Sequence, residues 1–215
     1  MTVTKNWQIP SKDLFSMGPI VPVLVIENVE DALPIAEALL AAEIKVLEVT
    51  LRTPSAIDVI AKIAKELPEA IVGAGTVTNR ELLQRSADAG AKFAISPGLT
   101  KDLLQAGNEG DIALIPGISS ISELMDGIDL GYDHFKFFPA EASGGVKAIQ
   151  SIGGPFPDIR FCPTGGINID NIRNYLALKN VACCGGSWLV SDEIIANKDW
   201  NKITELAKQA LAHVK

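Results

Sequence analysis

The sequence predicts an α/β fold of the (β/α)8 TIM-barrel type, with a short extra helix before the first strand. Three observations predict it. Eight short apolar runs recur along the 215 residues, a segment of helical character follows each run, and no glycine fingerprint follows the first run. Apolar runs that are nearly continuous are typical of parallel strands covered on both faces. Eight such units have the closed barrel as their familiar solution.

The predicted strands share a high content of β-branched and other apolar residues. They cover 20–26, 45–51, 71–77, 92–98, 113–118, 134–140, 160–166 and 181–188. The segments between them carry helix signals, clearest in 29–43, 54–69, 78–90 and 199–215. In 78–90, Thr78 or Asn79 is a suitable first cap and Gly90 a suitable stop. A short helix is expected near 10–18, before the first strand.

The rival architecture is the open, doubly wound sheet. That fold would place the pattern G-x-G-x-x-G directly after the first strand. The first predicted strand instead runs into IENVED (26–31), which contains no glycine. No linker or low-complexity tract interrupts the chain, so residues 1–215 are expected to form a single barrel domain.

Composition excludes several classes of partner. The net charge is −7, so neither nucleic acid nor an anionic membrane is expected as a partner, because both require clustered basic residues. The apolar stretches are too short to span a bilayer, and no signal peptide is recognisable. Three cysteines make no disulfide framework, which predicts a cytoplasmic protein. Two histidines without ligand spacing predict that no metal is bound.

The strand predicted over 45–51 carries polar residues at alternate positions. Glu48, Thr50 and Arg52 share one parity and therefore one face. A glutamate in the middle of an apolar strand is costly unless it is paired or used in chemistry. Arg52 reaches the carboxyl end of the strand, where active groups of parallel barrels lie. A purely structural pair between Glu48 and Arg52 is the competing interpretation.

Lys136 interrupts the apolar strand predicted over 134–140. Alternation places Lys136 on one face with His134 and Phe138, and Phe135 and Phe137 on the other. A closed barrel has no edge strand to which a lysine could reach. Burial disfavours the ammonium form, and a lysine amine freed in this way is nucleophilic near neutral pH. A structural ion pair between Lys136 and Glu48 would give the same sequence pattern.

Small residues and hydroxyls gather where other strands end. Thr76 lies in the GAGTV stretch, and Pro97 follows Ser96 at the end of the fourth run. The seventh and eighth runs end in paired glycines, and phosphate sites of barrels often lie in these two loops. Glycines allow backbone N–H groups to approach an anion closely. The candidate phosphate residues are Thr164, Gly165, Gly166, Gly185, Gly186 and Ser187.

These motifs resemble the 2-keto-3-deoxy-6-phosphogluconate aldolases, also called 4-hydroxy-2-oxoglutarate aldolases. The matching stretches are VLEVTLRT, VGAGTV, FAISPG, ALIPGISS, FKFFPAEASGG, RFCPTGGI and GGSWLV, and the similarity extends over essentially the whole chain. The combination of FKFFPAE with the distant EVTLRT is highly specific. The resemblance implies a class I aldolase without cofactor or metal, typically a homotrimer. Such an enzyme yields pyruvate and D-glyceraldehyde 3-phosphate, and 4-hydroxy-2-oxoglutarate would yield pyruvate and glyoxylate.

The resemblance also implies a role for each motif residue. Lys136 would form the imine with the substrate ketone, and Glu48 would be the general acid and base. Arg52 would hold the carboxylate with Thr76 beside it. The other substrate-binding residues would be Pro97 and Phe138 as pocket walls, Thr164 near the pyruvoyl group, and Gly165, Gly166, Gly186 and Ser187 around the phosphate.

Two further functions fit the same pattern. A phosphosugar isomerase or epimerase would share the glycine-lined phosphate site but would leave Lys136 without a covalent role. A barrel that only binds phosphorylated ligands would turn over no keto acid. The aldolase is the leading hypothesis because a lysine, a glutamate and an arginine are expected to converge at one rim.

Overall fold

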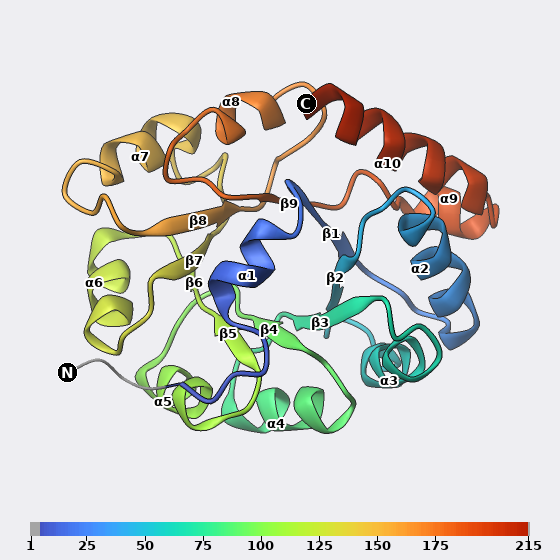
Figure 1. The fold of residues 1–215 in the computed structure, drawn as a ribbon, viewed down its shortest axis with the longest axis horizontal. Helices are drawn as coiled ribbons and strands as arrows, with labels where there is room; N and C mark the ends of the chain where they lie inside the picture. Colours follow the sequence, from blue (N-terminus) through green and yellow to red (C-terminus); the bar gives the residue numbers. More distant parts are fainter. Residues whose placement is uncertain (1–4, 215) are drawn as a thin grey trace.

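The computed structural model describes residues 5–214, in which parallel strands form a curled layer with helices around its outside (Figure 1). The strands are β1 Ile20–Leu24, β2 Val46–Thr50, β3 Ile71–Gly75, β4 Phe93–Ile95, β5 Ala113–Ile115, β6 Gly117–Ile118, β7 His134–Phe137, β8 Arg160–Pro163 and β9 Cys184–Gly186. The helices are α1 Ser11–Ser16, η1 Val29–Asp31 (a 3-10 turn), α2 Ala32–Leu40, α3 Ala56–Glu66, α4 Arg80–Asp88, α5 Lys101–Glu109, α6 Ile121–Asp129, α7 Gly145–Ile152, α8 Ile172–Leu176, α9 Asp192–Ala196 and α10 Trp200–Val214.

The strands pair in two groups. Six strands follow the order β5-β4-β3-β2-β1-β9, and three follow the order β6-β7-β8, all in parallel register. Single bridges from Phe161 to Val181 and from Thr164 to Gly185 connect the two groups at β8 and β9. The architecture is therefore an α/β fold with a curled parallel sheet.

Each predicted apolar run contains a strand, but one run is divided. Pro116 separates β5 from β6 inside the run 113–118, because proline has no N–H to donate to a ladder. Its carbonyl still accepts from the N–H of Lys136 at 2.9 Å. The predicted helix signals are confirmed where α4 begins, since the Asn79 side chain accepts from the N–H of Leu82. The expected extra helix near 10–18 is α1.

Two hydrophobic clusters hold the elements together. The larger one lies between the strands and the surrounding helices and includes Phe135 and Phe137. The smaller one lies on the inner face of the curled sheet, where Phe93 packs with Leu14 and Phe15 of α1. Figure 1 shows α1 lying across the curled layer of strands. The ring of Phe15 meets His134, the first residue of β7, edge-on at 5.0 Å, so α1 covers the amino ends of the strands.

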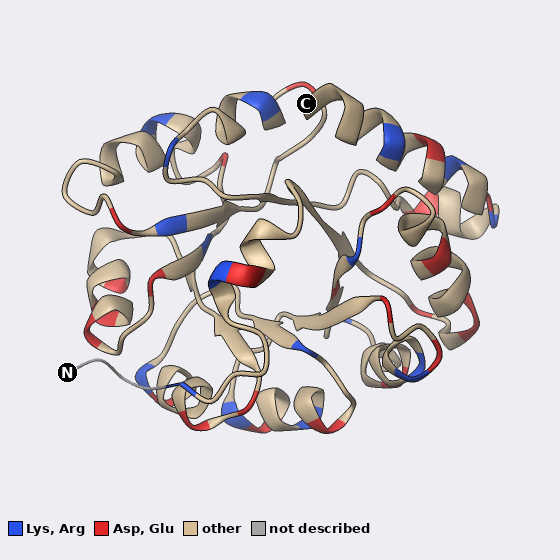
Figure 2. Cartoon of the chain, in the orientation of Figure 1, with Lys and Arg blue, Asp and Glu red and all other residues tan. Residues whose placement is uncertain are grey.

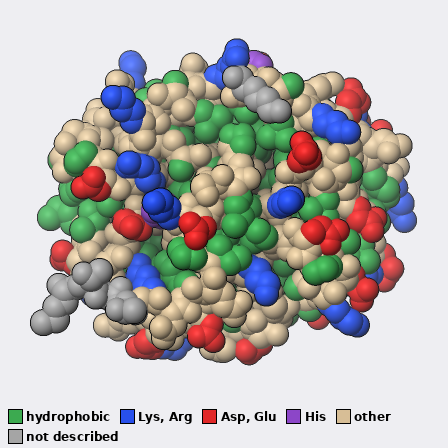
Figure 3. Space-filling view, viewed as in Figure 1, with side chains coloured by type: hydrophobic (Ala, Val, Ile, Leu, Met, Phe, Trp, Pro, Cys, Tyr) green, Lys and Arg blue, Asp and Glu red, His purple; other side chains and the backbone are tan. Residues whose placement is uncertain are grey.

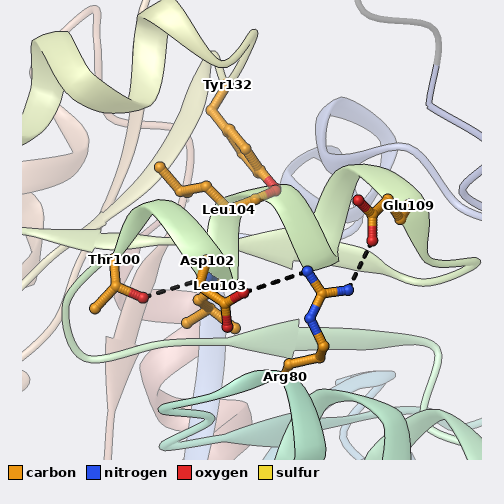
Figure 4. A network of polar contacts seen from close by, with 7 residues as sticks. All are labelled: Arg80, Thr100, Asp102, Leu103, Leu104, Glu109 and Tyr132. Atoms are coloured by element: carbon orange, nitrogen blue, oxygen red, sulfur yellow. Dashed lines mark hydrogen bonds and ion pairs between the residues drawn. The ribbon is translucent and has the colours of Figure 1, made fainter.

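Charged side chains lie mostly on the outer helices (Figure 2). Arg80 joins α4 to α5, with Nη1 2.6 Å from Glu109 and Nη2 3.4 Å from Asp102 (Figure 4). All three side chains are exposed, so salt screens this contact and it adds little to stability. Acidic and basic side chains are interspersed on the face that carries α1 (Figure 3). No helix within residues 5–214 has the length and apolar character that crossing a membrane requires.

Candidate active site

Lys136 and Glu48 meet on the inner face of the sheet. The Nζ of Lys136, from β7, lies 3.1 Å from Oε1 of Glu48, from β2. Their side chains are only 7% and 1% exposed. Alternation along β7 sends Phe135 and Phe137 into the outer core and leaves Lys136 facing inward, as the sequence predicted. The ion pair between these two residues is thereby confirmed, while the Glu48–Arg52 pair is not among the ion pairs of residues 5–214.

The immediate surroundings of the pair are small or aromatic. The Phe138 ring centroid lies 5.3 Å from the Lys136 Nζ, within the range of a cation–π contact. Gly117 and Cys162 are the register partners of Lys136 on the two neighbouring strands. Gly75, the last residue of β3, leaves the space that the Glu48 side chain occupies. The sequence did not predict that Glu48 is the group accommodated by Gly75.

The chemistry of the pair follows from its burial. An isolated charge would be very costly in this position, whereas an ammonium and a carboxylate in contact stabilise each other. Transfer of one proton from Nζ to Oε1 leaves a neutral amine beside a neutral acid. The amine can then add to a carbonyl carbon, and the acid can return its proton to the oxygen. The arrangement therefore suits imine formation.

The buried cysteines are poor competitors for this role. A hydrogen bond with Cys162, together with burial, raises the pKa of Cys183 well above the usual thiol range. Burial likewise raises the pKa of Cys184. Because a thiol attacks as its thiolate, these protonated sulfurs are inert near neutral pH. Neither of these two thiols competes with the Lys136 amine as a candidate nucleophile.

Residues predicted for the carboxylate lie after β2 and β3. Thr76 is half-buried directly after β3 and adopts φ +60°, which a β-branched residue seldom does. Arg52 is exposed two residues after β2 and makes no ion pair with the described residues. The hydroxyl of Thr50 already donates a hydrogen bond to the Leu24 carbonyl at 2.9 Å. Arg52 and Thr76 thus lie at the carboxyl ends of adjacent strands, and neither forms a hydrogen bond or ion pair with Lys136 or Glu48 within residues 5–214.

The remaining predicted residues lie at or just after the ends of β4, β8 and β9. The Pro97 backbone packs against Gly117, the register partner of Lys136. Thr164 is buried, and its Oγ1 has no hydrogen-bond partner among residues 5–214. The loop that follows contains Gly165 and Gly166, with φ values of +101° and +80° that favour glycine.

The last residues of β9 and the start of the following loop complete this part of the rim. Gly185 packs against the side chain of Thr164, and the two residues form one of the bridges between β8 and β9. Gly186 is covered by the ring of Trp188, and Ser187 between them is exposed. Both paired-glycine turns therefore lie at neighbouring strand ends, as predicted.

We expect Gly75→Ala to lower both activity and stability. A Cβ there would come within 2.7 Å of Glu48 Cγ, so the Glu48 side chain would have to shift from its present position beside Lys136. Crowding of this kind typically costs about 1–3 kcal/mol. Urea denaturation and kcat measure the two effects. Gly18→Ala is the matched control, because nothing lies within 4 Å of a Cβ at that position. Equal behaviour of the two variants would contradict the packing argument.

Comparison with known proteins agrees with this geometry. A family model described as KDPG and KHG aldolase matches residues 12–206. The chain belongs to the KDPG and KHG aldolase family. It is 67% identical over 210 residues to the 2-dehydro-3-deoxy-phosphogluconate aldolase of Pseudoalteromonas atlantica, covering 98% of each chain. It is 57% identical over 211 residues to the KHG/KDPG aldolase of Escherichia coli, covering 98% of this chain and 99% of that one.

A solved structure of the family bears on the mechanism. The KDPG aldolase of Legionella pneumophila, with pyruvate captured as a covalent carbinolamine, is 51% identical and superposes with a TM-score of 0.94. The alignment covers 95% of this chain and 100% of that one. A carbinolamine is the adduct of an amine with a ketone, so that family member carries out covalent amine chemistry on pyruvate.

Proposed function

We propose that this protein cleaves 2-keto-3-deoxy-6-phosphogluconate to pyruvate and D-glyceraldehyde 3-phosphate through a Schiff base on Lys136. The observation that carries the proposal is the buried contact of 3.1 Å between Lys136 Nζ and Glu48 Oε1. The names of the aldolase relatives from P. atlantica and E. coli support the choice of substrate.

In the proposed mechanism, Glu48 transfers one proton in each of the first two steps. The neutral amine of Lys136 attacks the C2 ketone, and Glu48 protonates the oxygen that leaves as water. The resulting iminium accepts the electron pair of the C3–C4 bond while Glu48 takes the proton of the C4 hydroxyl. D-Glyceraldehyde 3-phosphate departs and leaves an enamine of pyruvate. Protonation at C3 and hydrolysis then release pyruvate and the free lysine.

The rim residues orient the substrate around this centre. Arg52 binds the carboxylate with Thr76 beside it, while Pro97, Phe138 and Thr164 enclose the pyruvoyl group. The phosphate is bound at the opposite end by Gly165, Gly166, Gly186 and Ser187. The positive φ values after β8 support this assignment, because such turns can aim successive N–H groups at one anion. A substrate without phosphate, such as 4-hydroxy-2-oxoglutarate, would use the first part of the site alone.

Our proposal extends to the closure of the fold, the oligomeric state and the cellular location. We infer that the two groups of strands close into one (β/α)8 barrel formed by residues 1–215, supported by the bridges from β8 to β9. We also infer a homotrimer, for which exposed Ile121 and Met125 on α6 offer an apolar contact surface. Sedimentation at the mass of one chain would contradict the trimer.

A cytoplasmic location is supported by three free, buried cysteines, and cell fractionation tests it.

Relative turnover of three keto acids tests the proposal. We expect pyruvate from 2-keto-3-deoxy-6-phosphogluconate, from its C4 epimer and from 4-hydroxy-2-oxoglutarate, with the highest kcat/KM for the first. Chelation by EDTA should leave these rates unchanged. Isomerisation of a phosphosugar without pyruvate would favour the isomerase or epimerase hypothesis. Binding without turnover of any keto acid would favour a ligand-binding barrel.

A further inference from the structure

One polar contact beside the proposed phosphate loop has no part in the mechanism above. Tyr175, on α8, is completely buried, and its hydroxyl donates a hydrogen bond to Oε1 of Glu141. Glu141 itself is exposed and ends the FKFFPAE stretch after β7. The two residues are separated by 34 positions, so the bond ties the loop after β7 to the helix after β8.

The Glu141 stem is packed against the glycine turn. A Cβ on Gly166 would lie 2.6 Å from Cγ of Glu141, which means that the two groups are already in close contact. The backbones are also joined, since the N–H of Glu141 donates to the Gly165 carbonyl at 3.1 Å. The N–H of Ala140 donates to the Thr164 carbonyl at 2.8 Å. The position of Glu141 therefore influences the position of the turn.

The turn needs such support because its own residues have no side chains. Gly165 and Gly166 both adopt positive φ, and glycine also reaches many other conformations at little cost. Asn171 holds one side by donating from Nδ2 to the Gly166 carbonyl at 2.9 Å. Glu141 holds the other side. Without a fixed Glu141, an unrestrained carboxylate would also stand beside a bound phosphate and repel it.

We propose that Tyr175 and Glu141 are positioning residues that fix the Gly165–Gly166 turn for the phosphate of the substrate. The inference rests on the proposed function, because it requires that this turn binds the phosphate. Gly145 lies close to this contact, since a Cβ there would be 3.2 Å from the Tyr175 hydroxyl and 3.4 Å from Glu141 Oε1. The Tyr175–Glu141 contact affects binding of the phosphorylated end of the substrate and leaves the chemistry at Lys136 unchanged.

Tyr175→Phe tests the inference with two substrates. Loss of one hydrogen bond to a carboxylate should raise KM for 2-keto-3-deoxy-6-phosphogluconate about three- to tenfold while kcat stays within about twofold. For 4-hydroxy-2-oxoglutarate, which carries no phosphate, kcat/KM should remain that of the wild type. Tyr132→Phe is the matched control, because its buried hydroxyl donates to the Leu104 carbonyl at 2.8 Å, on α5. That control should change neither substrate selectively.

Glu141→Ala is a second test of the inference, and it leaves the buried ring of Tyr175 unchanged. It should produce the same selective rise in KM, and the double variant should add little to either single change. Equal losses for both substrates, or no change for either, would overturn the inference while leaving the proposed aldolase intact. Failure of the proposed function is recognised separately, since the wild type would then form no pyruvate or show no preference for the phosphorylated substrate.

Discussion

Replacement of Lys136 by methionine should abolish both turnover and covalent capture of pyruvate. The methionine side chain fills a similar volume but offers no amine, so no iminium can form. We expect kcat to fall by at least about 10³-fold. Borohydride reduction in the presence of pyruvate should add one pyruvoyl-derived group to the wild-type chain and none to the variant. Peptide mass analysis should place that group on Lys136.

The control for this experiment is an exposed lysine on α7. Lys147→Met should retain the wild-type kcat and the same adduct, because Lys147 lies on the outer surface of its helix. An adduct on another lysine, or an unmodified Lys136 in an active enzyme, would refute the assignment. The variant also leaves Glu48 buried without its cation, so its folding should be verified by circular dichroism before kinetics are interpreted.

Glu48→Gln should slow turnover but still allow the imine to form. The amide keeps the size and hydrogen-bonding capacity of the carboxylate, while proton transfer at the C4 hydroxyl is lost. General acid–base catalysis typically contributes about 10²- to 10⁴-fold, which sets the expected fall in kcat. Single-turnover trapping with borohydride should still capture pyruvate on Lys136, only more slowly.

A carboxylate outside the site provides the comparison for Glu48. Asp102→Asn removes an exposed charge on α5 that pairs with Arg80, and it should leave kcat unchanged. A Glu48→Gln variant with wild-type kcat would show that Glu48 only neutralises the ammonium. The structural ion pair considered from the sequence would then be the complete explanation of this glutamate.

The sequence predicted the inward lysine because strand alternation is a local property. Phe135 and Phe137 had to occupy one face, and Lys136 therefore had to occupy the other. The partner of Glu48 was harder to predict, since Arg52 and Lys136 were both possible. β2 ends at Thr50, so Arg52 lies in the turn beyond the strand rather than beside Glu48 on its inner face. Lys136 lies across the inner face and can make direct contact.

Other features depend on contacts between distant segments and were not predictable. The bond between Tyr175 and Glu141 requires α8, a helix of five residues, to lie beside the loop after β7. The role of Gly75 requires knowledge that Glu48 enters from the neighbouring strand. The division of the fifth run at Pro116 could have been predicted from proline alone, and the expectation of one uninterrupted strand there was wrong.

The helix α1 has an effect that extends far from its own position. Leu14 and Phe15 pack into the inner cluster that contains Cys162, the register partner of Lys136. Both side chains are buried there, so they extend the apolar packing on the inner face of the sheet at the amino ends of the strands. In such a medium of low polarity, an ammonium and a carboxylate attract each other several times more strongly than at the surface. Two side chains at the amino ends of the strands therefore contribute to the apolar surroundings of the Lys136–Glu48 pair.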